Sequence, residues 1–355
     1  MPKRDFQIAG RTIGPEQPPY IVAELSANHG GSLAHAIGLL EAAKSAGADA
    51  VKLQTYTADT ITIDHDGPEF RIKSGLWAGR TLYQLYQEAY TPWEWHDALF
   101  ARGRELGLTV FSSPFDESAV ALLEGLDAPA YKIASFELVD LPLIRRVAAT
   151  GKPAILSTGM ASMEEIREAL QAFRDAGGID VLLLHCISGY PTPPEQSNLR
   201  RIQRLAAELG CPVGLSDHTL GTEVAVAAVA LGACLIEKHF TLRRSDGGPD
   251  AGFSLEPDEM AALARGARIA YLALGTGAHV AAITHGRQLV LGADWRHQLQ
   301  SLRPQRHSGT RALGHRGQPV GFVDSAAKPA SPDWARHPRH EGVPGPVGWP
   351  GRVAQ

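Results

Sequence analysis

The stretch CPVGLSDHTLGTEVAVAAVALGACLIEKHF (211–240) is the clearest guide to the fold. It begins and ends with short apolar runs typical of strands (211–218 and 234–240), and a helix-length segment rich in alanine and valine (221–232) lies between them. A strand, a helix and a second strand within about thirty residues are typical of a parallel βαβ unit. The stretch therefore predicts two neighbouring parallel strands that end at the same edge of a sheet.

The same alternation continues toward the N-terminus. Eight units in about 255 residues predict an α/β fold, a closed (β/α)8 or TIM barrel. An open doubly wound sheet is the alternative, but no G-x-G-x-x-G sequence follows the first strand. The predicted strands are 20–25, 50–55, 109–115, 130–135, 153–159, 180–186, 211–218 and 234–240, with helices that include 33–46, 94–106, 162–176, 197–209, 221–232 and 257–274.

The composition is that of a globular enzyme. The 355 residues are 44% hydrophobic and 20% charged, which supplies enough apolar surface for a large core. A formal net charge of −4 gives no overall positive field for a phosphate backbone, so we expect no nucleic acid partner. No signal peptide or membrane-spanning run is present, and the three cysteines cannot all pair. We therefore expect a cytoplasmic protein with no membrane partner and with buried thiols.

The composition changes near residue 275. Residues 276–355 hold seven of the fourteen histidines and nine arginines against one lysine, and no period of 2 or 3.6 runs through them. We expect residues 1–275 to form the barrel domain and residues 276–355 to form an irregular, disordered tail.

Polar residues end nearly every predicted strand. In a barrel of this kind the active site lies at the carboxyl ends of the strands. A ring of polar residues there favours a functional site over isolated buried ion pairs. The candidates are Glu24, Lys52, Gln54, Ser112, Ser113, Lys132, Ser135, Glu137, Ser157, Thr158, Ser188, Tyr190, Ser216, Asp217, His218, Glu237, Lys238 and His239.

Two histidines end neighbouring strands. His218 and His239 are expected at the same height, about one strand spacing of 5 Å apart, where both imidazoles can share a divalent cation. Two protein ligands leave coordination positions for water or a substrate carbonyl. The alternative is a hydrogen-bonded pair of Asp217 and His218 with no metal.

Two lysines face the same mouth. Lys52 and Lys132, together with nearby serine hydroxyls, favour the binding of a small phosphorylated anion. Either lysine would instead form a Schiff base in an aldolase, but a nucleophilic lysine needs apolar surroundings that lower its pKa.

Nine motifs together resemble the sialic acid synthase family, in the family's order and over about residues 18–275. Their sequences are AELSANHGGSL (23–33), GADAVKLQTYT (47–57), FSSPFD (111–116), YKIASFE (131–137), LSTGMAS (156–162), GYPTP (189–193), GLSDHTLG (214–221), IEKHFTL (236–242) and GPDAGFSLEP (248–257).

The resemblance implies a transferase that condenses phosphoenolpyruvate with an N-acylated amino sugar and releases phosphate. It implies that His218 and His239 hold a divalent metal ion, Mn²⁺ or alternatively Mg²⁺ or Co²⁺, which polarises the sugar aldehyde. Glu24 and Glu137 are the implied proton-transfer residues. The implied ligands of phosphoenolpyruvate are Lys52, Ser113, Lys132, Ser135, Ser157, Ser188 and Ser216, and those of the sugar are Gln54, Tyr190 and Asp250.

Within the family, the SANH variant (26–29) and the run GLWAGRTLYQLYQEAYTPWEW (75–95) are most similar to the branch that makes pseudaminic acid. This similarity implies 2,4-diacetamido-2,4,6-trideoxy-L-altrose as the acceptor. The aromatic residues of the long 56–92 connection and its end either form an apolar wall for this 6-deoxy sugar or only pack the connection onto the barrel. They are Trp77, Tyr83, Tyr86 and Trp93.

Family members continue into a small antifreeze-like domain, which crosses a swapped homodimer and gives an arginine to the sugar site of the other subunit. Residues 276–355 do not resemble that domain. The expectation of a homodimer therefore rests on the family resemblance alone. The alternatives to the main interpretation are an N-acetylneuraminate or legionaminate synthase, a Schiff-base aldolase, and an inactive sugar-binding remnant.

Overall fold

The structure is a computed structural model that describes residues 6–73, 75, 77–275, 282–285 and 288–291. The chain divides into two units, one of which contains the residues up to Gly275. Within the described residues, no helix is both long and apolar enough to span a bilayer. Cys186, Cys211 and Cys234 are buried and form no disulfide with one another.

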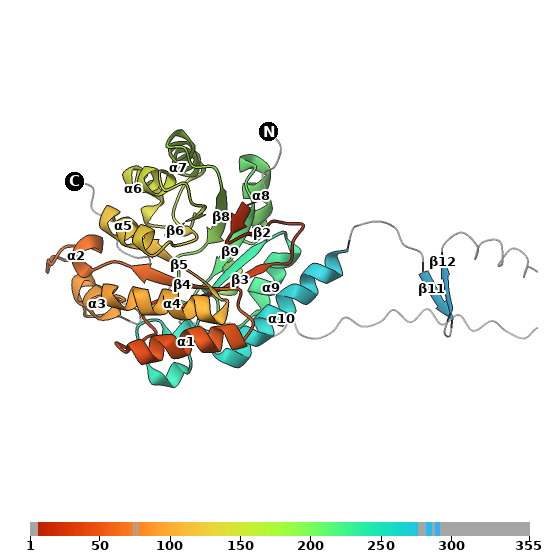
Figure 1. The fold of residues 1–355 in the computed structure, drawn as a ribbon, viewed down its shortest axis with the longest axis horizontal. Coiled ribbons are helices and arrows are strands. Elements are labelled where there is room, and N and C mark those ends of the chain that lie inside the picture. Colours follow the sequence, from red (N-terminus) through yellow and green to blue (C-terminus); the bar gives the residue numbers. More distant parts are fainter. Residues whose placement is uncertain (1–5, 74, 76, 276–281, 286–287, 292–355) are drawn as a thin grey trace, which may run out of the picture. The chain divides into compact units, whose positions relative to one another are not determined.

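Eight parallel strands of the described chain form a closed barrel, as predicted (Figure 1). Each strand pairs with the next in sequence, and β10 closes the ring by pairing with both β9 and β3. All eight lie where the sequence places them, within two residues at each end. They are β3 (Tyr20–Glu24), β4 (Ala50–Thr55), β5 (Thr109–Pro114), β6 (Tyr131–Ile133), β7 (Ala154–Ser157), β8 (Val181–Cys186), β9 (Val213–Asp217) and β10 (Leu235–His239).

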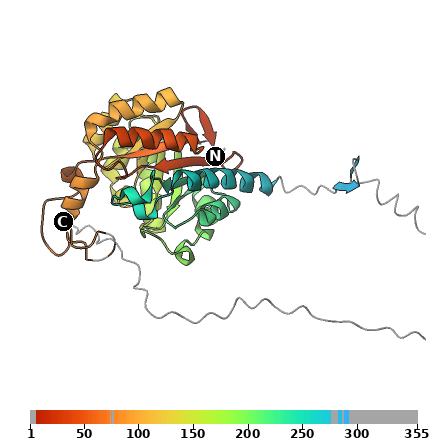
Figure 2. The same ribbon diagram turned by 90° about the horizontal axis from the view of Figure 1, so that it is seen from below.

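Helices cover the outside of the barrel in both views (Figure 1, Figure 2). Their starts follow local sequence signals: Ser32, Asp116, Asp140 and Ser162 each accept a hydrogen bond from a free amide of the first turn. The helices are α1 (Leu33–Ser45), α4 (His96–Leu106), α5 (Glu117–Gly125), α6 (Leu141–Ala148), α7 (Met163–Asp175), α8 (Arg200–Leu209), α9 (Glu223–Ala230) and α10 (Pro257–Leu274).

The connections also carry short helices. The long connection after β4 contains α2 (Ala58–Ile61) and α3 (Leu82–Ala89). Single 3₁₀ turns follow several strands, at Glu137–Val139, Pro194–Gln196, Arg244–Asp246 and Ala251–Phe253, and another at Trp93–Trp95 precedes α4.

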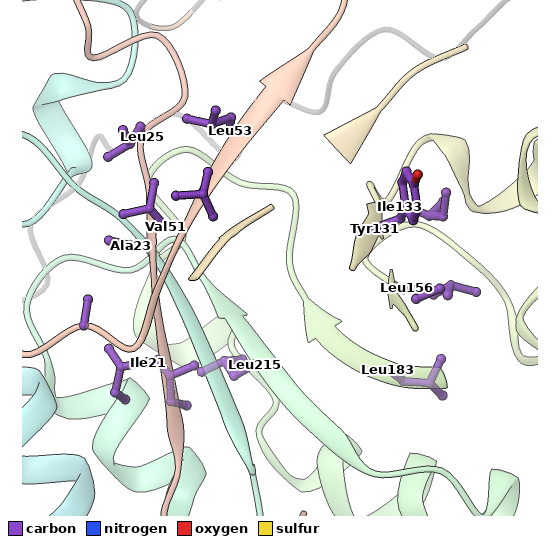
Figure 3. Packing of buried hydrophobic residues seen from close by; sticks show 14 of the residues in the cluster. Ile21, Ala23, Leu25, Val51, Leu53, Tyr131, Ile133, Leu156, Leu183 and Leu215 are labelled. Carbon is purple, nitrogen blue, oxygen red and sulfur yellow. The ribbon is translucent and has the colours of Figure 1, made fainter. Parts of the chain in front are cut away.

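The strands alternate between two apolar environments, because successive side chains of a strand point to opposite faces. Outward residues such as Ile21, Val51 and Leu215 join the large core between strands and helices (Figure 3). Inward residues in the lower half of the barrel, such as Phe111 and Ile155, form a second cluster. The upper half of the interior is left for polar side chains.

An N-terminal hairpin completes the inner cluster. β1 (Phe6–Ile8) and β2 (Arg11–Ile13) pair antiparallel, and Phe6, Ile8 and Ile13 are buried against the lower barrel residues. The sequence analysis did not predict these three-residue strands, because they are too short to show a period.

A second short hairpin follows the barrel in the sequence. β11 (Ala282–His285) and β12 (Gln288–Leu291) pair antiparallel, and the sequence analysis did not predict them. The other residues of the expected 276–355 tail lie outside the described residues, so its boundary and its disorder remain predictions.

Candidate active site

One cavity at the carboxyl ends of the strands brings together eleven of the fourteen predicted site residues. They come from the inward positions of the barrel strands and from the connections that follow them, which explains why residues far apart in sequence meet here. The eleven are Lys52, Gln54, Ser113, Lys132, Ser135, Glu137, Tyr190, Ser216, His218, His239 and Asp250.

The other three predicted residues lie behind the cavity surface. Glu24 is buried beneath it, where it accepts a hydrogen bond from Gln54 at 2.9 Å. Ser157 is fully buried. Ser188 stands next to Gly159, because a methyl group added at Gly159 would lie 2.8 Å from the Ser188 hydroxyl oxygen.

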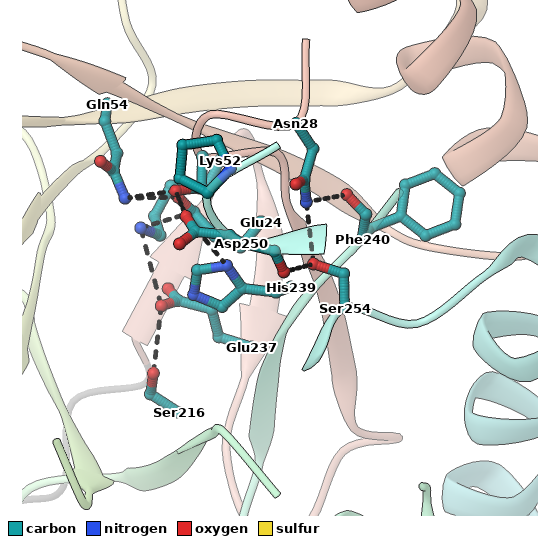
Figure 4. Close-up of polar contacts among 12 residues, drawn as sticks. Glu24, Asn28, Lys52, Gln54, Ser216, Glu237, His239, Phe240, Asp250 and Ser254 are labelled. Atoms are coloured by element: carbon teal, nitrogen blue, oxygen red, sulfur yellow. Dashed lines mark hydrogen bonds and ion pairs between the residues drawn. The ribbon is translucent and has the colours of Figure 1, made fainter. Parts of the chain in front are cut away.

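Buried charges alternate along the cavity floor (Figure 4). Lys52 Nζ lies 2.5 Å from Glu24 Oε2 and 3.6 Å from Glu237 Oε1. Lys132 Nζ lies 3.5 Å from the same Glu237 oxygen, which also accepts a hydrogen bond from Ser216 at 3.2 Å. Glu237 therefore bridges the two lysines. The sequence analysis included Glu237 among the candidates at the strand ends but assigned it no role.

The buried lysines and glutamates stabilise each other's charged forms. Burial alone would lower the pKa of Lys52, but the carboxylates of Glu237 and Glu24 raise it above its usual value. Burial raises the pKa of Glu237, yet Lys132 and Lys52 hold it below its usual value. Lys52 is thus a retained cation, which disfavours it as a Schiff-base nucleophile.

The hydroxyls of Ser135 and Ser188 lie close to Gly159. Ser135 Oγ accepts a hydrogen bond from the Gly159 amide at 3.2 Å. A methyl group at Gly159 would stand 2.8 Å from both Ser135 Oγ and Ser188 Oγ, closer than real contacts allow. On the other wall, Lys52 Nζ donates to Ser113 Oγ at 3.4 Å. This cluster of hydroxyls and ammonium groups fits a small oxyanion.

The two predicted histidine ligands face each other. The ring centroids of His218 and His239 are 5.4 Å apart. His218 Nδ1 lies 2.9 Å from the Ile187 carbonyl oxygen, which can only accept a hydrogen bond, so Nδ1 carries a hydrogen and Nε2 is the nitrogen left to bind an ion. His239 Nδ1 is buried and has no hydrogen-bond partner among the described residues. Both rings can therefore donate to an ion.

The histidine site is limited to these two protein ligands. Among the described residues, no three His, Cys, Asp or Glu side chains converge as a metal site. Burial and the charge of His218 lower the pKa of His239 well below its usual value, which keeps its ring neutral. Burial also lowers the pKa of His218, but Cys186, whose sulfur is 3.9 Å from Nδ1, raises it above its usual value.

The alternative prediction of a hydrogen bond between Asp217 and His218 is wrong, while the presence of a metal stays a prediction. Asp217 faces the helices rather than the cavity, and its carboxylate binds Lys238 at 2.7 Å and the Thr219 amide at 2.9 Å. The reason is the two-residue period of β9: Ser216 and His218 point inward, so Asp217 must point outward.

A polar network joins Gln54 and Asp250, two of the three residues predicted to contact the sugar. Ser26 Oγ donates to Asp250, and Gln54 Nε2 donates to Ser26 Oγ at 3.3 Å. Ser26 holds a left-handed backbone conformation with φ of 45°, which is uncommon for a residue with a side chain. The loop of Asp250 is anchored by Asn28, which donates to Ser254 at 2.8 Å. Ser26 and Cys186 line the cavity and were not selected from the sequence.

The long connection supplies an apolar side of the cavity. Trp77 and Tyr86 line it, as do Phe70 and several aliphatic residues of the same segment. Trp77 Nε1 donates to the Pro249 carbonyl at 2.8 Å and so ties the connection to the loop of Asp250. Tyr83 instead binds Asp59 at the surface, and Trp93 donates to the Tyr56 carbonyl. The predicted aromatic wall is thus formed by two of its four residues.

The sequence profile of the NeuB family matches residues 39–279. The chain belongs to the NeuB family. It is 47% identical to the pseudaminic acid synthases of Campylobacter jejuni over 258 residues, 73% of this chain and 75% of the relative, and of Helicobacter pylori over 259 residues, 73% and 76%. The N,N'-diacetyllegionaminic acid synthase of Legionella pneumophila is 38% identical over 262 residues, 73% and 74%.

A solved structure also resembles this member of the NeuB family. The N-acetylneuraminic acid synthetase of Leptospira borgpetersenii aligns with a TM-score of 0.71 and 30% identity, over 86% of this chain and 98% of the other. The barrel fold and the membership in a family of sialic-type acid synthases agree with the resemblance found in the sequence.

Proposed function

We propose that this protein condenses phosphoenolpyruvate with 2,4-diacetamido-2,4,6-trideoxy-L-altrose to give pseudaminic acid and phosphate. The observation that carries the proposal is the single cavity in which two lysines and a serine cluster lie beside paired histidines. The higher identity to pseudaminic acid synthases than to the legionaminic acid synthase supports the choice of sugar.

Phosphoenolpyruvate is assigned to the charged half of the cavity. Its phosphate and carboxylate are anions, and Lys52 and Lys132 are the cations that face this half. Ser113, Ser135 and Ser216 present hydroxyls to the same cavity, and Ser157 and Ser188 have buried hydroxyls without a hydrogen-bond partner among the described residues. These groups hold the anion with C3 directed at the sugar.

His218 and His239 are assigned to a divalent cation, Mn²⁺ or alternatively Mg²⁺ or Co²⁺. The available lone pairs of the two rings fit this role, and water or substrate would complete the coordination. When bound, the ion supplies Lewis-acid polarisation of the sugar aldehyde.

The chemistry joins C3 of phosphoenolpyruvate to the sugar aldehyde carbon. Water then adds to C2, and the C2–O bond to phosphate breaks, which leaves a C2 carbonyl and free phosphate. Glu137 is buried at the cavity wall and is assigned to proton transfer with the attacking water. Glu24 is the second residue assigned to proton transfer, and burial raises its pKa above the usual value.

The sugar is assigned to the half of the cavity that Asp250, Gln54 and Tyr190 line. Asp250 and Gln54 offer hydrogen-bonding groups for acetamido and hydroxyl substituents, while Trp77 and Tyr86 offer an apolar surface for the C6 methyl group.

Phosphate release will test the proposed function. We expect the fastest release with phosphoenolpyruvate and the diacetamido-trideoxy altrose sugar in the presence of Mn²⁺, and slower release with the legionaminic acid precursor and with N-acetylmannosamine. Better use of N-acetylmannosamine would refute the choice of sugar. Trapping of a lysine by borohydride would favour the aldolase, and no release with any of the sugars would favour a binding remnant.

Filling the space at Gly159 should weaken the binding of phosphoenolpyruvate. Overpacking of this kind costs about 1–3 kcal/mol. We expect Gly159→Ala to lose affinity for phosphoenolpyruvate, because its methyl group collides with the hydroxyls of Ser135 and Ser188 and displaces them. Titration calorimetry with phosphoenolpyruvate measures this loss. Gly125→Ala is the control, since nothing lies within 4 Å of its added methyl group. Equal affinity of the two variants would remove Gly159 and its serines from the site.

A further inference from the structure

Two tripeptides on neighbouring strands share one arrangement. Ser216-Asp217-His218 ends β9 and Glu237-Lys238-His239 ends β10, and the strands pair with Ser216 opposite Glu237 and Asp217 opposite Lys238. The outer members of each tripeptide line the cavity. The middle members point to the helix side of the barrel, and the proposed function leaves them without a role.

The two middle residues form a buried ion pair. Lys238 Nζ lies 2.7 Å from Asp217 Oδ2, and the side chains are only 1% and 2% exposed. Lys238 Nζ also donates to the Thr219 carbonyl at 2.6 Å, and Asp217 Oδ1 accepts from the Thr219 amide at 2.9 Å. The pair therefore binds both backbone polar groups of Thr219, the residue that follows His218.

Stability alone does not explain this pair. Its surroundings are the apolar layer of strands and helices, where removing two charges from water costs about as much as their attraction returns, so a pair of apolar residues would serve stability equally well. What only the ion pair provides is a fixed geometry. It joins the ends of β9 and β10 and fixes the backbone on the far side of His218, while the Thr192 amide binds the carbonyl of His218 at 2.9 Å.

We propose that Asp217 and Lys238 are positioning residues for His218 and His239. They act on the opposite face of the same two strands and hold the two imidazoles at the spacing that a shared cation requires. This inference rests on the proposed metal role of the histidines, which is tested first by comparing Mn²⁺ binding in the unaltered protein and in His239→Ala.

The test uses a variant that removes the pair without leaving a lone buried charge. In the double variant Asp217→Asn with Lys238→Met, the amide can still accept from Thr219, but the link to β10 is lost. We expect Mn²⁺ affinity, measured by electron paramagnetic resonance of the free ion, to fall about ten- to a hundredfold. The affinity for phosphoenolpyruvate should stay unchanged, and Lys238→Arg should retain Mn²⁺ binding.

Thr55→Val is the matched control. Thr55 is fully buried on the helix side of β4, where its hydroxyl lies 2.6 Å from Ser112 Oγ and 2.8 Å from His96 Nε2. Its loss perturbs the same layer at a strand that pairs with neither β9 nor β10. Unchanged Mn²⁺ affinity in the double variant would overturn the proposal. So would an equal fall in both affinities and in melting temperature, as a merely structural role predicts. Absence of Mn²⁺ binding in the unaltered protein would instead refute the metal role itself, and the positioning role with it.

Discussion

The His239→Ala variant is expected to lose Mn²⁺ binding and to turn over about a hundred- to a thousandfold more slowly, since a bound ion supplies several kcal/mol of transition-state stabilisation. His239 is one of two imidazoles that face each other in the cavity, and its pKa lies well below the usual value because it is buried, so it is a neutral donor at pH 7. Phosphate release and electron paramagnetic resonance of Mn²⁺ measure the two losses.

The fold should survive this change. His239 Nδ1 makes no hydrogen bond within the described part of the chain, so the truncation breaks none at that atom. His185→Asn is a suitable control, because His185 is also buried, on β8, but lies outside the cavity, bonded to the Ser197 carbonyl at 2.7 Å. Full activity of His239→Ala after exhaustive chelation would exclude the metal role.

The strands could be predicted because each is a continuous apolar run between turn residues. In a parallel barrel both faces of a strand are covered, so its sequence stays apolar until the active-site end. The same rule located the site, since polar residues such as Lys52 and His218 interrupt these runs only where the cavity begins.

The features that could not be predicted depend on which face of a strand a side chain points to and on local backbone conformation. Asp217 and His218 are neighbours in sequence but lie on opposite faces of β9, so their adjacency falsely suggested a hydrogen bond. Ser26 has a left-handed backbone conformation, which could not be predicted from the residue pattern. The sequence analysis predicted Cys186 only as a buried thiol. The structure places it on the inward face of β8, where it lines the cavity.

Lys52→Met is expected to weaken the binding of phosphoenolpyruvate about ten- to a hundredfold, because a charge-assisted contact worth roughly 1.5–3 kcal/mol is lost. The same change leaves Glu24 and Glu237 with one cation fewer, and breaking a buried pair in this way costs about 3–5 kcal/mol of stability. Calorimetry with phosphoenolpyruvate and thermal unfolding measure the two effects separately.

A second variant separates the loss of binding from the loss of stability. Adding Glu24→Gln to Lys52→Met removes the carboxylate that lies nearest to the lysine, so stability should recover in part while the affinity for phosphoenolpyruvate stays low. Lys132→Met provides the comparison, since among the described residues Lys132 forms an ion pair only with Glu237, at 3.5 Å, and the variant should lose affinity with a smaller loss of stability. If both Lys52→Met and Lys132→Met bind phosphoenolpyruvate as tightly as the unaltered protein, the anion does not occupy this half of the cavity. The alternating charges of the floor would then serve only to fill the barrel interior.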